Sequence, residues 1–321
     1  MKVLVTGSTG WLGRHLCPLL RAAGHETVGL DVASGPYTDV IGSVTDRTLV
    51  GSLFEAYEFG GVVHAAALHK PDIARYPQQA FVDVNVTGTL ALLEGASARP
   101  ETRFVFTSTT SLMISQAIRG EHADEAIWLD ERAQPLEPRN IYGVTKLAAE
   151  GLCRQHHLER GLSCIVLRTA RFFPEADDEI EGFGGLNLKT NELLNRRATV
   201  DDMARAHVAA LEAAPRIDFG LYLVSAPTPF APADCRMLKT DAPAVVRRLF
   251  PDAEQLYAKV GWTLPPMIGR VYDGRAITRD LPFAYETDFA SALDAMRAGK
   301  PSPMTDDPSY TSPALNADWQ G

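Results

Sequence analysis

The sequence predicts an α/β fold, in which a doubly wound parallel sheet carries a small, discontinuous C-terminal subdomain. Short apolar runs without polar alternation recur through the first 170 residues. Segments with helical hydrophobic spacing separate these runs, and a glycine-rich turn joins the first run to the first helical segment. Strands that are apolar throughout are typical of a parallel sheet covered by helices on both faces.

Each element is expected from its hydrophobic pattern and from the residues that bound it. The strands are expected at 2–6, 27–30, 61–66, 103–108, 164–167 and 220–224. The helices are expected at 11–23, 46–57, 78–97, 140–160 and 201–213. Asp46 is predicted to cap its helix, because an aspartate at that position can accept a free backbone N–H. Pro227, Pro229 and Pro232 are expected to interrupt regular structure after the last strand.

The amino-acid composition excludes several classes of protein. The chain has 321 residues, of which 45% are hydrophobic, and its formal net charge is -9. These values exclude a wholly disordered or fibrous chain, and the acidic balance argues against a nucleic-acid partner. No run approaches the roughly 18 to 20 apolar residues of a membrane span. We therefore expect a cytoplasmic protein with no membrane partner and, from its first residues, no signal peptide.

The cysteines and histidines do not form a metal-binding pattern. The four cysteines are widely spaced and include no C-x-x-C pair, and the eight histidines lack ligand spacing. We expect no metal, and we expect the cysteines to be buried as small apolar side chains.

A glycine triplet follows the first expected strand and opens the first expected helix. Gly7 permits a tight turn, Gly10 allows a pyrophosphate to approach the backbone, and Gly13 lets helix and strand pack closely. The triplet alone also fits a plain turn. Asp31 ends the second strand, where a carboxylate accepts hydrogen bonds from an adenosine ribose and repels a 2′-phosphate. Together these features predict a Rossmann domain that binds NAD in preference to NADP.

A phenol, an ammonium and a run of hydroxyls form the second constellation. Tyr142 and Lys146 stand four residues apart, so they lie on one face of the expected helix 140–160. A cation beside a tyrosine stabilises the phenolate, which is otherwise a poor base at neutral pH because its pKa is about 10. Residues 107–111 all carry hydroxyls and follow a strand, at the edge where parallel sheets bind ligands. A coincidental, solvated Tyr–Lys pair is the alternative.

Taken together, these motifs resemble the extended short-chain dehydrogenase/reductases, in the NAD-dependent epimerase/dehydratase group. The resemblance covers roughly residues 1–225, with weaker traces to about 285. Besides Asp31, it rests on TGSTGWLG at 6–13, VVHAAA at 62–67, NVTGT at 85–89, FTSTTS at 106–111, YGVTK at 142–146, LRTARF at 167–172 and TVDDMARAH at 199–207.

The resemblance implies roles for individual residues. Thr109 would be the hydrogen-bonding hydroxyl, Tyr142 the general base or acid, and Lys146 the cation that lowers the Tyr142 pKa and holds the nicotinamide ribose. The implied cofactor-binding residues are Gly7, Gly10, Trp11, Leu12, Gly13, Asp31, Ser43, Val44, Ala65, Ala66, Ala67, Asn85, Thr107, Tyr142 and Lys146. The implied substrate-binding residues are His69, Thr110, Arg171 and Arg270.

Departures from the family pattern reduce the number of possible reactions. Thr110 and Ser111 stand where dehydratases of the group carry an Asp–Glu pair, which speaks against a dehydratase. Arg171 replaces the asparagine usual in nucleotide-sugar epimerases, and the following stretch to Asp201 is short. Arg171, with Arg196, Arg197 and Arg270, could hold a carboxylate or phosphate. An alternative explains any one of these arginines equally well: its side chain is solvated, or it forms an ion pair with the acidic stretch 175–181.

The predicted function is therefore that of an NAD-dependent oxidoreductase acting at a secondary alcohol of a sugar or sugar nucleotide, by epimerisation through a keto intermediate. The alternative is an NAD-dependent dehydrogenase of a free sugar, uronic acid or other small hydroxy compound, with net release of NADH. A third hypothesis is a non-catalytic regulator that binds NAD.

The expected domain organisation follows from where these motifs lie. Residues 1–168 and 200–225 are expected to form the NAD-binding domain with the catalytic residues. Residues 169–199 and 226–300 are expected to form the substrate-binding subdomain, and 301–321 an irregular tail that adds little. By analogy with the family, a homodimer through 78–97 and 140–160 is expected.

Overall fold

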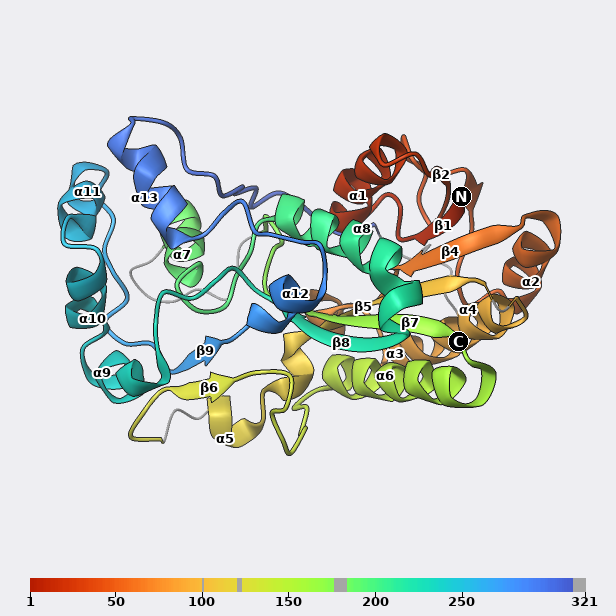
Figure 1. Cartoon of the computed structure of the whole chain (residues 1–321), viewed down its shortest axis with the longest axis horizontal. Helices are drawn as coiled ribbons and strands as arrows, with labels where there is room; N and C mark the ends of the chain where they lie inside the picture. The colour runs from red at the N-terminus through yellow and green to blue at the C-terminus, as the bar shows by residue number, and fades with distance from the viewer. Residues whose placement is uncertain (100, 120–122, 176–183, 314–321) are drawn as a thin grey trace.

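The computed structural model describes residues 1–99, 101–119, 123–175 and 184–313 (Figure 1). Within them, parallel strands form a seven-stranded sheet in the order β3-β2-β1-β4-β5-β7-β8. The strands are β1 (Lys2–Thr6), β2 (Glu26–Asp31), β3 (Val40–Ile41), β4 (Phe59–His64), β5 (Arg103–Thr109), β7 (Ser163–Thr169) and β8 (Phe219–Val224). The strand order reverses between β1 and β4, and ligands bind outside the carboxyl ends of the strands at such a point. The predicted doubly wound α/β fold is confirmed.

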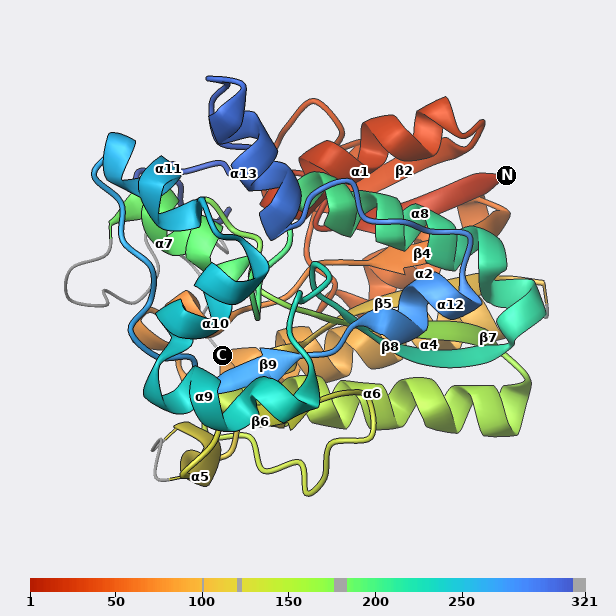
Figure 2. The same ribbon diagram turned by 60° about the vertical axis from the view of Figure 1, so that its left-hand side comes forward.

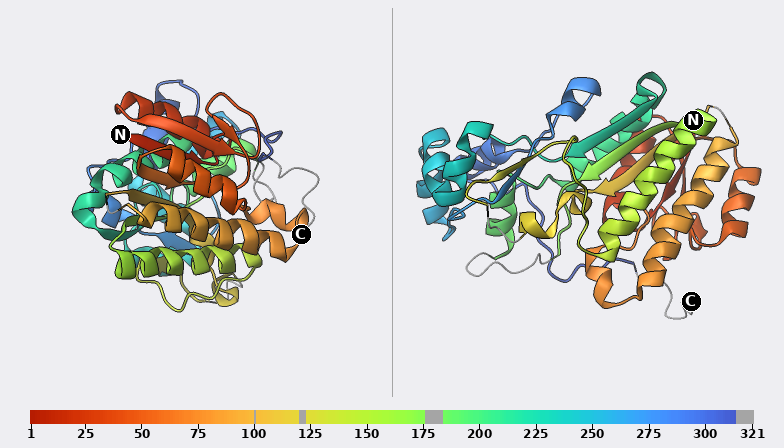
Figure 3. Two further views of the ribbon diagram at one scale, coloured as in Figure 1. Left: turned by 90° about the vertical axis from the view of Figure 1, so that its right-hand side faces the viewer. Right: turned by 90° about the horizontal axis from the view of Figure 1, so that it is seen from below.

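Helices cover both faces of this sheet (Figure 3). On one face α1 (Trp11–Ala22) packs against α8 (Val200–Ile217). On the other face α2 (Arg47–Ala56), α4 (Thr89–Ser97) and α6 (Ile141–Arg160) lie side by side. Val3 and Val5 enter the core on the first face and Leu4 enters the core on the second. Burial on both faces explains why β1 has no polar alternation.

The predicted helix 78–97 consists of three segments. It begins as α3 (Gln78–Val82), passes through a π-helical stretch η2 (Asp83–Gly88) and ends as α4. A π-helical stretch inside an α-helix is rare and is often found at functional sites. The capping role of Asp46 is confirmed, because its carboxylate accepts a hydrogen bond from the Leu49 amide.

Several helices and strands were not predicted from the sequence. A second parallel sheet pairs β6 (Ile127–Leu129) with β9 (Arg270–Tyr272). The additional α-helices are α5 (Gln116–Arg119), α7 (Gly185–Glu192), α9 (Cys235–Thr240), α10 (Ala242–Leu249), α11 (Ala253–Lys259), α12 (Arg275–Asp280) and α13 (Phe289–Arg297). Short 3₁₀ turns occur at η1 (Lys70–Ala74), η3 (Thr110–Met113) and η4 (Pro232–Asp234). Pro232 stands in the first turn of η4, where proline is tolerated because the first N–H groups need no intrahelical partner.

The C-terminal helices form a lobe beside the sheet. Figure 2 shows α7, α9, α10 and α11 gathered at the end of the molecule away from the N-terminus. Asp202 of α8 ties this part of the chain to the sheet, because its buried carboxylate accepts the backbone N–H groups of Glu286 and Thr287. Among the described helices, none combines the length and apolar character that a bilayer crossing requires.

Candidate active site

The glycine turn between β1 and α1 lines a pocket, here called the first pocket. Gly7 has a φ of +74°, and a Cβ atom there would lie 2.8 Å from the Ala66 nitrogen. A Cβ atom on Gly13 would lie 2.2 Å from the Gly7 oxygen. These two glycines are needed for backbone packing. Gly10 differs, because a Cβ atom there would meet only the Gly7 oxygen, at 3.2 Å, among the described atoms. Gly10 lines the pocket, so it leaves room there for a ligand.

The amino terminus of α1 and the end of β2 give this pocket opposite charges. The first turn of α1 contains no acidic residue, and its N-cap residue, Gly10, has no side chain that could accept an N–H. Asp31 is buried at the end of β2, where its carboxylate accepts the N–H groups of Thr9 at 2.9 Å and Ala33 at 3.1 Å. The helix end attracts phosphate, and the carboxylate can accept ribose hydroxyls.

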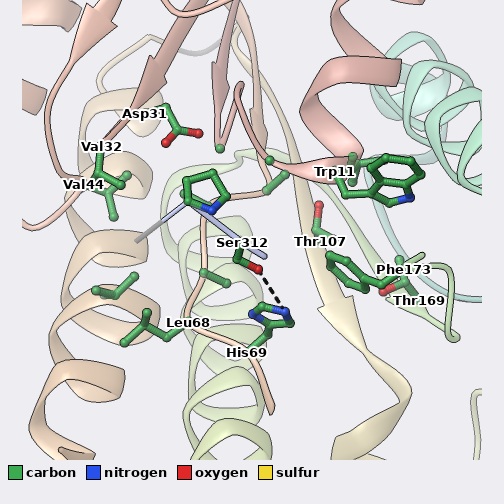
Figure 4. Close-up of a pocket in the computed structure, with 18 of the residues that line it drawn as sticks. Trp11, Asp31, Val32, Val44, Leu68, His69, Thr107, Thr169, Phe173 and Ser312 are labelled. Atoms are coloured by element: carbon green, nitrogen blue, oxygen red, sulfur yellow. Dashed lines mark hydrogen bonds between the residues drawn. The ribbon is translucent and has the colours of Figure 1, made fainter. Parts of the chain in front are cut away.

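The first pocket lies at the carboxyl ends of the central strands (Figure 4). Most of the predicted cofactor-binding residues line it, namely Gly7, Gly10, Trp11, Leu12, Asp31, Ser43, Val44, Ala65, Ala66, Ala67, Thr107, Tyr142 and Lys146. Strand β4 ends at His64, two residues before the predicted end, so the three alanines follow the strand. Their backbone therefore turns along the pocket wall.

Two predicted cofactor-binding residues, Gly13 and Asn85, are not among the described residues that line this pocket. Gly13 packs behind the turn. Asn85 is buried in the π-helical stretch, where it exchanges two 3.0 Å hydrogen bonds with the backbone of Leu68. Its amide also donates to the Thr145 hydroxyl at 3.1 Å. Asn85 thus fixes Leu68, which does line the pocket, against α6.

A second pocket adjoins the first. The residues that line both are His69, Tyr142, Thr169, Phe172 and Phe173. The predicted substrate residues Thr110 and Arg171 line the second pocket, as does Thr109. Arg270 is in β9 and lines neither pocket as far as the chain is described. The structure therefore brings the predicted catalytic tyrosine to the junction of two pockets but leaves Arg270 outside them.

Tyr142 is held at this junction by the first turn of α6. Asn140 caps that helix, because its side chain accepts the Gly143 N–H at 3.0 Å. Burial raises the pKa of Tyr142 to about 12, although a hydrogen bond with the Thr109 side chain acts in the opposite direction. The phenol is consequently protonated at neutral pH and is poised beside a hydroxyl at the end of β5.

Lys146 lies one helical turn beyond Tyr142 and is buried. Its ammonium lies 4.0 Å from the centroid of the Phe106 ring, a cation–π contact. Burial lowers the pKa of Lys146 to about 7. Since Thr109 supplies the lowering influence on the Tyr142 pKa here, the role of Lys146 in lowering that pKa stays a prediction.

His69 adds a positive charge at the junction. Its Nδ1 lies 2.6 Å from the Asp72 carboxylate, and its Nε2 lies 3.9 Å from that of Glu175. Burial disfavours the charged imidazole, but the two carboxylates outweigh burial and raise the pKa of His69 to about 9. His69 is therefore an imidazolium at neutral pH. The sequence drew attention to His69 but gave no indication of its carboxylate partners.

Arg171 is held by a buried carboxylate that the sequence analysis missed. Glu192 lies 2.7 Å from both Arg171 and Arg196, and 2.8 Å from Arg197. Burial alone would raise the pKa of Glu192, but the three guanidinium groups outweigh burial and hold that pKa far below its ordinary value. The spacing of Glu192 four residues before Arg196 was the available signal. Of the predicted acidic partners at 175–181, Glu175 contacts His69, and the others lie outside the described residues.

Two adjacent aromatic residues were also missed. Phe172 and Phe173 stack with their ring centroids 4.4 Å apart, and Phe173 stacks on His69 at 5.0 Å. Both rings line both pockets. Their position directly after β7 was the available signal, because residues that follow a parallel strand face the ligand-binding edge.

The prediction that the tail adds little is wrong. Residues 301–313 form no helix or strand, and residues 314–321 lie outside the described chain. However, Tyr310, Ser312 and Pro313 line the first pocket. The Trp11 N–H donates to the Tyr310 hydroxyl at 3.0 Å. Sequence periodicity does not detect a segment that packs through individual side chains without regular structure.

Comparison with known proteins agrees with this geometry. The model of the NAD dependent epimerase/dehydratase family matches residues 3–182. A UDP-glucose 4-epimerase of Rhizobium meliloti (strain 1021) is 29% identical over 188 residues, which are 56% of this chain and 54% of that protein. UDP-glucuronate 4-epimerase 5 of Arabidopsis thaliana is 28% identical over 186 residues, covering 52% of this chain and 41% of that protein. The chain thus spans about half the length of these curated relatives.

Solved structures resemble the whole fold. The UDP-Glc/GlcNAc 4-epimerase of Campylobacter jejuni superposes with a TM-score of 0.66 at 18% identity, covering 92% of this chain and 99% of that one. A short-chain dehydrogenase/reductase superfamily protein from Agrobacterium tumefaciens, solved with bound NAD, gives a TM-score of 0.65 at 22% identity, covering 93% and 98%. At these identities the likeness shows the fold alone.

Proposed function

The chain belongs to the NAD dependent epimerase/dehydratase family, and on that premise we propose that it is an NAD-dependent oxidoreductase acting at a secondary alcohol of a sugar or sugar nucleotide. The observation that carries this proposal is the position of Tyr142, which lines both pockets and is hydrogen-bonded to Thr109. A phenol at that junction can exchange a proton with a hydroxyl in the second pocket while the reacting carbon faces the first.

The residues of the first pocket fit a dinucleotide. Asp31 would hold the adenosine ribose, and the Trp11 and Leu12 amides at the amino terminus of α1 would hold the pyrophosphate. Lys146 would hold the nicotinamide ribose. The space left by Gly10 supports this assignment, because a side chain there would enter the pocket. When bound, NAD supplies the acceptor and donor of the hydride.

The side chains of the protein would control the proton. Thr109 orients the substrate hydroxyl toward the Tyr142 oxygen, and Tyr142 takes its proton. Burial keeps Tyr142 protonated at rest, so the phenolate requires a nearby positive charge. We assign this charge to the protonated form of Lys146, one helical turn away in α6. For epimerisation, the same phenol would return the proton to the carbonyl oxygen of the keto intermediate as the carbonyl carbon regains a hydride on its other face.

The wall of the second pocket supports an anionic substrate. Arg171 lines this pocket, its side chain is 27% exposed, and Glu192 fixes its guanidinium. A fixed guanidinium can form paired hydrogen bonds with a carboxylate or phosphate. The names of the relatives, UDP-glucose and UDP-glucuronate 4-epimerases, favour a sugar nucleotide. Arg171 itself favours the second candidate function, dehydrogenation of a free uronic acid with net release of NADH.

Domain organisation and assembly complete the proposal. We assign 1–168 and 200–225 to NAD binding and catalysis, and 169–199 with 226–300 to substrate binding. We further assign a homodimer to the surface of α3, α4 and α6. Val144 and Leu158 of α6 support this surface, because both are large apolar side chains exposed to solvent.

A turnover assay with added NAD tests the proposal. The substrates are UDP-glucose, UDP-glucuronate, glucose and glucuronate, and both isomer formation and NADH are measured. Isomer formation without net NADH supports epimerisation. Net formation of NADH with glucuronate, and with no other substrate of the set, supports the dehydrogenase. NAD binding without either product across a wider sugar panel would instead support a non-catalytic regulator.

A further inference from the structure

The end of the described chain crosses the first pocket as a tethered segment. Asp306 pairs with Lys189, a buried residue whose ammonium also donates to the Pro174 carbonyl. The Asp307 N–H donates to the same carbonyl at 2.8 Å. These contacts fix one end of residues 306–313, here named the strap, beside the segment that follows β7. Beyond the anchor, the strap continues into the pocket.

Two residues of the strap contact the wall of the pocket, at two different places. The Tyr310 hydroxyl accepts the Trp11 N–H at 3.0 Å, and the two rings meet edge to face with their centroids 5.4 Å apart. Ser312 lies 3.2 Å from His69 Nε2 (Figure 4). Since His69 is an imidazolium, its Nε2–H donates to the Ser312 oxygen. The strap therefore joins the glycine turn to the β4 side of the pocket.

The contact at Trp11 uses a group that dinucleotide binding requires. The first-turn amides of a helix have no intrahelical acceptors, so they are the groups that a pyrophosphate binds. One of these amides is directed at the Tyr310 oxygen, and a single N–H cannot serve two acceptors well. A pyrophosphate oxygen could accept the Trp11 N–H only in place of the Tyr310 hydroxyl.

We propose that the strap is an autoinhibitory segment that competes with the NAD pyrophosphate for the Trp11 amide. This inference rests on the proposed NAD site. In the closed state the Tyr310 hydroxyl accepts the Trp11 N–H. NAD binds after Tyr310 leaves the pocket, while the anchor at Asp306 and Asp307 stays in place. The apparent affinity for NAD is then reduced in proportion to the fraction of molecules in the closed state.

The test measures NAD binding by calorimetry with the full chain, a Tyr310→Phe variant and a chain ending at Pro308. Tyr310→Phe keeps the ring contacts and removes the oxygen. It should bind NAD roughly 2- to 10-fold more tightly, as expected for the loss of one competing hydrogen bond. The shortened chain keeps the anchor and should bind at least as tightly. Tyr57→Phe is the control, because Tyr57 follows α2 outside the pocket.

Hydrogen exchange of peptides covering the strap gives a second readout. NAD should increase exchange in residues 308–313 of the full chain, because these residues leave the pocket. Equal NAD affinity in all three proteins, or weaker binding without the Tyr310 hydroxyl, would overturn the strap as a competitor and leave the NAD assignment intact. If neither the full nor the shortened chain binds NAD, the cofactor assignment fails and the strap fails with it.

Discussion

Asp31 and Arg171 both line the site, but the chain holds them in different ways. Asp31 ends a core strand and is fixed by the backbone amides of Thr9 and Ala33. Arg171 is fixed by Glu192, a side chain contributed by the separate helix α7. The cofactor pocket is thus built from strand ends and turns, whereas the wall of the substrate pocket depends on buried ion pairs. Substitutions should therefore have different consequences in the two regions.

The largest effect is expected at the junction of the two regions. Tyr142→Phe should lower kcat by roughly 10²- to 10⁴-fold, the usual contribution of a positioned acid–base group. Thermal stability should stay close to that of the wild type, because only one oxygen is lost. Steady-state kinetics and calorimetry measure the two quantities. Activity of Tyr142→Phe equal to that of the wild type would remove Tyr142 from the mechanism.

The second effect concerns stability on the substrate side. Glu192→Gln leaves the guanidinium groups of Arg171, Arg196 and Arg197 without their shared carboxylate. Breaking a buried ion pair in this way costs about 3–5 kcal/mol, which denaturant unfolding would measure. The control is Glu254→Gln, because the Glu254–Arg247 pair is exposed and should contribute little.

The same carboxylate gives this stability a pH dependence. The pKa of Glu192 in the folded protein lies below its ordinary value of 4.5. The stabilisation is therefore present above about pH 4.5 and is lost as the pH falls below it. The Glu192→Gln protein should show a weaker acid dependence of unfolding than the wild type. Identical pH profiles would show that Glu192 is not an important charge in this region.

A smaller effect is expected on the cofactor side. Asp31→Asn removes the charge that would repel a 2′-phosphate and keeps a side-chain oxygen for one of the two backbone amides, since Thr9 and Ala33 donate to different oxygens of Asp31. The preference for NAD over NADP should fall by about 10-fold, equivalent to one electrostatic contact of about 1.4 kcal/mol. Binding titrations with both dinucleotides measure this ratio. Asp46→Asn, at the N-cap of α2, should leave it unchanged.

A further effect links the two regions through His69. Because the pKa of His69 is raised from 6.5 to about 9, its ion pair with Asp72 stabilises the fold fully below about pH 6.5. That stabilisation is lost as the pH rises through about 9. Thermal unfolding between pH 6 and 10 should therefore show a decline in the wild type that His69→Gln lacks. A shared decline would assign the pH dependence to other groups.

The sequence predicted the cofactor region in more detail than the substrate region, for a physical reason. Gly7, Gly10 and Asp31 follow strands whose apolar runs are recognisable, so their placement at one sheet edge could be deduced. Tyr310 reaches the site through contacts that leave no periodic signal, and the only sequence signal of Glu192 was its spacing to Arg196. The helices after Pro232 were missed because proline was expected to break structure, although it can also begin a helical turn.

The most direct test of the account is reduction of the nicotinamide by substrate. The NAD-loaded protein is mixed rapidly with a sugar nucleotide or a uronic acid, and the absorbance of reduced nicotinamide is followed in the wild type and in Tyr142→Phe. We expect reduction in the wild type, transient for an epimerase and lasting for a dehydrogenase, and a rate at least 100-fold lower in the variant. A protein that binds both NAD and substrate but reduces no nicotinamide, or a variant that reduces it as fast as the wild type, would contradict the account.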